Sequence, residues 1–116
     1  MEFGVLGPLR VAVGGQAVPI ASAREAHTGD SLGFIHHHLG RHAQALACYQ
    51  EALDLYRTIG DHHSQATTLS RIGDTHRATG DVQAAASAWR QAVAILDELG
   101  HPDADEVRAK LRGQDA

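Results

Sequence analysis

The chain has little of several residue types that mark particular classes of protein. Cys48 is its only cysteine, so no disulfide can form within the chain, which favours a reducing, cytoplasmic setting. Lys110 is its only lysine, and the formal net charge is −4 with neutral histidines. Because binding to the nucleic-acid backbone needs clustered positive charge, we expect no direct contact with DNA or RNA.

Long apolar runs are also missing. No stretch approaches the roughly 20 apolar residues that cross a bilayer, and the N-terminus lacks a charged segment followed by an apolar one. We therefore expect neither a membrane span nor a signal peptide. The 116 residues, 43% hydrophobic and 21% charged, are typical of one soluble globular domain.

The first segment, residues 1–22, differs in pattern from the rest. Apolar side chains alternate with Arg10 and Ala12, which is the period of a strand. Gly14-Gly15 then precedes a second run of strand formers that ends at Pro19, so the segment is predicted to form a short β-hairpin. Its strand-forming residues are Phe3, Val5, Leu9, Val11, Val13, Val18 and Ile20.

The remainder, residues 23–116, repeats itself at an offset of 40 residues. The matched pairs are Leu32 and Ile72, Gly33 and Gly73, His36 and His76, Gly40 and Gly80, Ala45 and Ala85, Tyr49 and Trp89, Ala52 and Ala92, and Gly60 and Gly100. Self-similarity at a fixed period is the signature of a solenoid, in which each repeat packs on the next.

Each repeat unit is predicted to contain two helices. The expected helices cover residues 23–39, 42–59, 63–79 and 81–99, and a fifth helix covers 102–112. A glycine after each of the first four is the expected left-handed terminator, and Asp61 and Asp81 are placed to cap the helices that follow. The predicted fold is mainly α: an α-solenoid of two helix pairs with a C-terminal capping helix, preceded by the hairpin.

Small and large side chains alternate along each repeat. Gly33, Ala45 and Ala52 are small where helices must approach closely, whereas Tyr49 and Trp89 are large enough to fill the space between them. We expect these residues to form the core, with Val107 and Leu111 docking the fifth helix.

This pattern resembles the tetratricopeptide repeat (TPR) family over residues 24–112. The resemblance implies a non-catalytic module that binds a protein partner in a concave groove built from the first helix of each unit. The chain departs from the family in its period, which is 40 rather than 34. It also has Gly29 and Leu69 where an aromatic residue is usual.

The same resemblance implies which side chains face the groove. They are Asp30, Phe34, His37 and His38 from the first unit and Ser70, Asp74 and Arg77 from the second. Phe34 is expected to be the apolar anchor and Arg77 to bind a carboxylate. The alternative is a solvated helix face that binds nothing.

Four stretches are similar to a narrower family, the actinobacterial transcriptional regulators of the SARP/AfsR type. Three of them, residues 32–40, 45–49 and 96–104, match the C-terminal TPR region of such regulators, and residues 3–9 match the opening strands of their winged-helix domain. The recognition helix is missing, and no phosphate-binding G-x-x-x-x-G-K-[ST] motif occurs. The chain resembles the two ends of such a regulator joined together.

Two motifs suggest other chemistry. Residues 29–33 match G-x-S-x-G, but the residues before Ser31 are polar and do not form the buried strand that a hydrolase needs, so we expect no enzyme. Nine histidines suggest a metal, yet Gly40 separates His38 from His42. His63 falls in a turn with no further ligand in view. We expect no cofactor, and no zinc or nickel binding tighter than micromolar.

The chain is expected to form a homodimer. A stacked array generally needs three repeats, and this chain has two. An isolated two-stranded hairpin is marginal in water, so two chains are expected to join hairpins around a two-fold axis. Two alternatives to the dimer stay open: residues 1–20 fold back on the repeats, or they are disordered. A separate alternative to partner binding is that the module serves only structural oligomerisation and has no other ligand.

Overall fold

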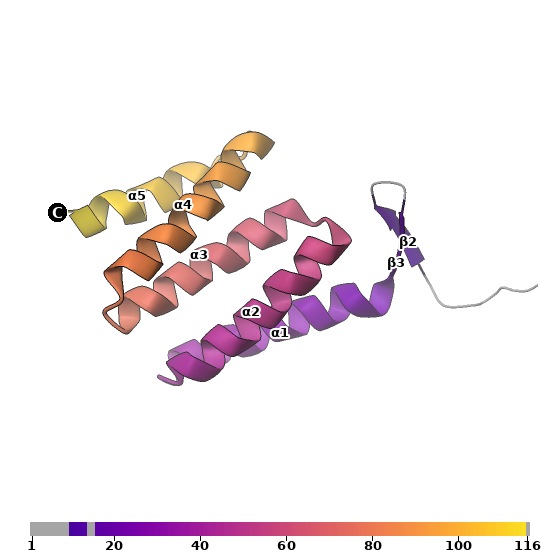
Figure 1. The fold of residues 1–116 in the computed structure, drawn as a ribbon, viewed down its shortest axis with the longest axis horizontal. Coiled ribbons are helices and arrows are strands. Elements are labelled where there is room, and N and C mark those ends of the chain that lie inside the picture. Colours follow the sequence, from indigo (N-terminus) through magenta and orange to yellow (C-terminus); the bar gives the residue numbers. More distant parts are fainter. Residues whose placement is uncertain (1–9, 14–15, 116) are drawn as a thin grey trace, which may run out of the picture.

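The computed structural model describes residues 10–13 and 16–115, and this part of the chain is mainly helical. Five helices follow one another (Figure 1). They are α1 (Ile20–His38), α2 (His42–Ile59), α3 (His62–Ala78), α4 (Val82–Leu99) and α5 (Asp103–Asp115). The predicted helical architecture of two pairs and a fifth helix is therefore confirmed.

Two short strands precede the helices. Strand β2 (Arg10–Val13) pairs antiparallel with β3 (Gln16–Pro19), with Arg10 opposite Pro19 and Val13 opposite Gln16. The expected Gly14-Gly15 turn and residues 3–9, which carry the winged-helix resemblance, lie outside the described residues. The connected hairpin stays a prediction.

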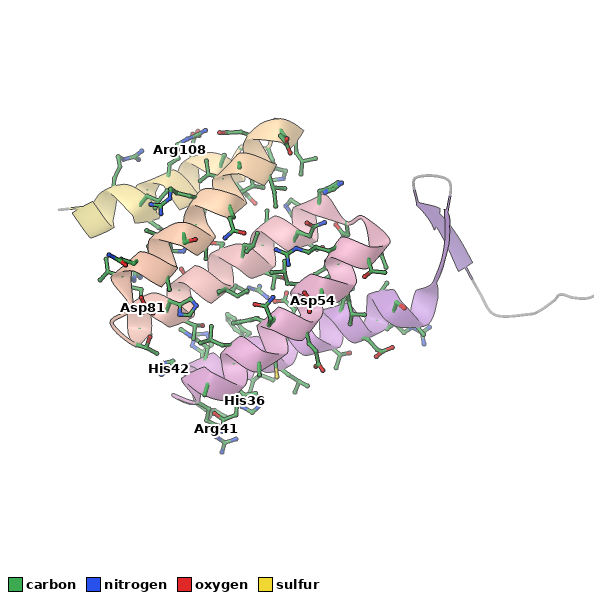
Figure 2. All side chains as sticks on the ribbon, in the orientation of Figure 1. His36, Arg41, His42, Asp54, Asp81 and Arg108 are labelled. Carbon is green, nitrogen blue, oxygen red and sulfur yellow. The ribbon has the colours of Figure 1, made fainter. Side chains whose placement is uncertain are left out.

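The helix ends follow the glycines that the sequence singled out. Gly40, Gly60, Gly80 and Gly100 have φ values of 79°, 74°, 86° and 63°, a conformation that favours residues without a Cβ. Asp61 accepts a hydrogen bond from the Ser64 amide, and Asp81 accepts one from the Ala84 amide, each at 3.1 Å. Both predicted caps are confirmed; Asp81 is labelled at the α3–α4 turn in Figure 2.

The first and last helices are longer than predicted. Helix α1 begins at Ile20 rather than at residue 23, directly after Pro19, whose fixed φ suits the chain that enters a helix. Helix α5 runs to Asp115 rather than 112, and Gly113 lies within it.

The core lies between successive helices. One cluster of buried apolar residues comes from α2, α3, α4 and α5 and includes Leu53, Leu69, Trp89, Leu96 and Val107. A second cluster joins Ala26 of α1 to Ala52, Tyr56 and Ile59 of α2. Helix α5 docks through Ala104 and Val107, both buried, with Leu111 partly buried beside them, as expected for a capping helix. Arg108, labelled in Figure 2, adds ion pairs to Asp97 of α4 and to Asp105.

The closest approach within each helix pair is a glycine against an aromatic ring. A Cβ added to Gly33 would lie 2.6 Å from the ring of Tyr49, and one added to Gly73 would lie 2.4 Å from Nε1 of Trp89. The Trp89 indole also donates a hydrogen bond to the Ser70 carbonyl at 3.1 Å. The small and large residues of the repeat thus fill one another's space, as predicted.

No helix within the described residues is long and apolar enough to cross a membrane.

We predict that Gly73→Ala destabilises the fold. Alanine favours a helix over glycine by about 1 kcal/mol, but its methyl group would overlap Trp89, and overpacking costs about 1–3 kcal/mol. Gly113→Ala is the matched control, because a Cβ there meets nothing within 4 Å. Urea unfolding of both variants measures the difference. A Gly73→Ala protein as stable as Gly113→Ala would contradict the packing.

Candidate partner-binding groove

The first helices of the repeat, α1 and α3, line one surface together with α5, and this surface contains two neighbouring hollows. The α1–α3 hollow, about 130 Å³, is lined by Phe34, His37, His38, Tyr49, Arg71 and Asp74. The α3–α5 hollow, about 200 Å³, is lined mainly by Ser70, Arg71, Asp74, Asp103, Glu106 and Lys110. Arg71 and Asp74 line both hollows, so the two hollows adjoin, and together they are called the groove.

Two ion pairs cross this groove and join its helices. Arg71 donates from Nη1 to Oδ2 of Asp30 at 2.7 Å, which links α3 to α1. Lys110 donates to both carboxylate oxygens of Asp74 at 2.9 and 3.1 Å, and to Oγ of Ser70 at 3.0 Å, which links α5 to α3. These four charged side chains are 13–35% exposed, so solvent screens them less than it screens ordinary surface pairs.

Phe34 lies at the mouth of the α1–α3 hollow. Its ring meets the His38 ring edge-on, with 4.2 Å between centroids, and the Arg71 guanidinium lies 5.1 Å from its centroid. Even so, 45% of the residue is exposed. Phe34 therefore offers an aromatic surface that neighbours hold in place without covering it.

His37 is held by α3. Thr75 donates its hydroxyl proton to the Arg71 carbonyl at 3.1 Å, so the Thr75 oxygen accepts from Nδ1 of His37 at 2.9 Å. Burial lowers the pKa of His37 below its usual 6.5, and the nearby His38 and His42 lower it further, whereas Asp74 opposes them. The lowered pKa favours the neutral imidazole, and a neutral ring that donates to Thr75 carries its proton on Nδ1.

Most of the residues predicted to face the groove lie together. Phe34, His37 and His38 line one hollow, Ser70 lines the other, and Asp74 lines both. Asp30 takes part through its ion pair with Arg71. The groove role of these residues stays a prediction, because proximity alone does not test binding.

Arg77 has a different neighbourhood from the one expected. Its guanidinium lies 5.5 Å from the centroid of the Trp89 ring, a cation–π contact, and it is absent from the lining of both hollows. The cations in the groove are Arg71 and Lys110, neither of which was predicted to face it. Lys110 follows Ser70 by 40 residues, so extending the repeat offset into the fifth helix would have found it. The repeat offset gives no such indication for Arg71.

Comparison with known proteins agrees with this architecture. A family model described as tetratricopeptide repeat matches residues 23–98, more than half of the chain. The chain belongs to the tetratricopeptide repeat family. Such repeats form non-catalytic scaffolds that generally mediate protein–protein interaction. The resemblance inferred from the sequence is thereby confirmed for this region.

This TPR chain is also similar in sequence to part of a much longer protein. Over 69 residues, or 60% of the chain, it is 33% identical to the regulatory protein AfsR of Streptomyces griseus. The chain spans 7% of the length of that relative. The similarity to AfsR-type TPR regions is thus shown, whereas the activities of the whole regulator do not carry over with it.

We predict that His37 titrates with a midpoint below pH 6.5 in the folded protein, as measured by NMR of the imidazole protons. Because its folded pKa is depressed, the unfolded chain binds the proton more readily. The stability that His37 contributes is therefore present above pH 6.5 and lost as the pH falls through its folded pKa. His37→Gln should remove both the signal and this part of the pH dependence. A His37 midpoint at or above 6.5 would contradict the assignment.

Proposed function

We propose that this TPR chain is a protein-interaction module that binds a segment of a partner protein along the groove of α1, α3 and α5 and catalyses no reaction. The observation that carries the proposal is that the two hollows adjoin at Arg71 and Asp74, which line both. Two adjoining hollows along three helices suit an extended or helical segment better than a compact small molecule.

The lining indicates what the segment offers. An apolar side chain would pack on the exposed half of Phe34, since aromatic anchors in partly enclosed pockets carry much of the binding energy at interfaces. At the α5 end, Glu106 forms no ion pair with the described residues. Among those residues, Asp103 has only the imidazoles of His63 and His101 within ion-pair distance. We propose a partner segment with an apolar residue followed by basic ones.

The setting of the interaction belongs to the same proposal. The identity shared with AfsR supports a role in a regulatory protein of an actinobacterium. The lone Cys48, which leaves no internal disulfide, supports the cytoplasm. The partner would then be another component of transcriptional regulation.

We predict that Phe34→Ala weakens binding of peptides selected from a random displayed library by at least about tenfold, because truncating an aromatic anchor costs about 2 kcal/mol. Ile35→Ala is the matched control: its side chain is adjacent, 52% exposed and outside both hollows. Fluorescence anisotropy gives both affinities. Equal affinity for the two variants would place binding elsewhere.

A second candidate function, oligomerisation, has its own observation. Leu32 and Ile35 are 45% and 52% exposed and lie along one face of α1. Leu39, the residue after the end of α1, is 59% exposed. Ile72, the repeat equivalent of Leu32, is buried at 7%. The face of α3 that contains Ile72 is covered, whereas the equivalent face of α1 is open. A helix from a second copy could pack on this open face, in addition to the strand pairing expected from the sequence.

We predict a homodimer at tens of micromolar by light scattering. A version that starts at Ala21 separates the two interfaces: loss of the dimer assigns it to the strands, and persistence assigns it to the helices. In the latter case Ile35→Asp should give a monomer, whereas Leu99→Asp, a change at an exposed leucine of α4, should not. A monomeric full chain would rule out this second function.

A further inference from the structure

Three potential metal ligands from distant parts of the sequence meet beside the groove. His63 lies in the first turn of α3, His101 between α4 and α5, and Asp103 at the start of α5. One ligand atom from each lies within 4.8 Å of the others. Oδ2 of Asp103 is 3.8 Å from Nε2 of His63 and 3.6 Å from Nδ1 of His101, and the two imidazole centroids are 4.6 Å apart.

We propose that His63, His101 and Asp103 form a binding site for a divalent transition-metal ion such as Zn²⁺ or Ni²⁺. Two imidazoles with one carboxylate suit these ions, whereas Mg²⁺ and Ca²⁺ prefer oxygen ligands throughout. Three protein ligands leave a further position for water or an external group. The proposal does not rest on partner binding in the groove, although Asp103 also lines the α3–α5 hollow.

The geometry requires a modest rearrangement. In a tetrahedral site with metal–nitrogen bonds of about 2.0–2.1 Å, ligand atoms lie about 3.4 Å apart. The two carboxylate–imidazole distances above exceed this by a few tenths of an ångström, whereas the ligand atoms of the two imidazoles, which lie within 4.8 Å of each other, must approach by up to about 1.4 Å. The three side chains are 37–49% exposed. Because solvent surrounds much of each, a change of rotamer can supply this movement without disturbing the core.

One hydrogen bond limits the affinity. The Asp103 amide donates to Nδ1 of His101 at 3.1 Å. An ion bound to Nδ1 displaces this bond. An ion bound to Nε2 instead requires the imidazole proton to move to Nδ1, which also removes it. The proposed site is accordingly micromolar, within the limit expected from the sequence.

The ion would join the start of α3 to the start of α5. Helix α5 otherwise docks through Ala104, Val107 and the Lys110–Asp74 pair, and Asp103 also lines the α3–α5 hollow. A bound ion would therefore hold the capping helix against the repeats and draw the Asp103 carboxylate away from the groove.

Calorimetric titration of the full chain with zinc chloride or nickel chloride tests the site. We expect one micromolar equivalent, weakened at least about tenfold in His63→Gln and in Asp103→Asn, as expected when a metal site loses a ligand. His62→Gln is the matched control, because it removes the adjacent imidazole, which lies outside the cluster. If His63→Gln or Asp103→Asn loses its helicity, as measured by circular dichroism, His101→Gln takes the place of that variant.

Amide hydrogen exchange supplies a readout that is independent of affinity. Zinc should slow exchange in α5 of the wild-type chain, and chelation with EDTA should reverse the effect, whereas His63→Gln should show neither. Affinity that is unchanged in His63→Gln and Asp103→Asn, or reduced equally in His62→Gln, would overturn the proposal, since the binding would then belong to the other histidines.

Discussion

The contact between a helix glycine and the aromatic ring of the next helix determines how this structure is built. At Gly33 and Gly73 the rings of Tyr49 and Trp89 occupy the space that a side chain would need. Both rings are almost fully buried, and the alanines at matching places in the repeat are fully buried. Because protein interiors are packed as densely as organic crystals, such a pair fixes the separation of its two helices closely.

That fixed separation is repeated after 40 residues, so the helix pairs stack instead of packing around a common centre. Figure 1 shows α3 lying between the first helix pair and the α4–α5 pair. The ion pairs from Arg71 to Asp30 and from Lys110 to Asp74 then link α1, α3 and α5 in turn. Arg71 and Asp74 border both hollows and Lys110 borders one, so the groups that link the helices also give the groove alternating charge.

Nearly all of the helical architecture could be predicted, because its signals are local or periodic. Glycine terminators and aspartate caps depend on a few adjacent residues, and the repeat offset reports packing that occurs twice. The side chains of the candidate groove were expected from the family resemblance, and their role in binding stays a prediction. Arg77 shows the limit: its place in the repeat matches that of His37, yet the guanidinium covers Trp89 while His37 bonds to Thr75.

The sequence by itself determined the five helices, the glycines that follow the first four of them, the paired small and large residues, and the TPR family. Only the tertiary structure decided which charges meet. Arg71 reaches Asp30 across 41 residues, Lys110 reaches Asp74 across 36, and His63 meets His101 and Asp103. Long polar side chains have several rotamers, and their partners lie on other helices. Their contacts therefore depend on how the helices are placed, which no spacing along the chain encodes.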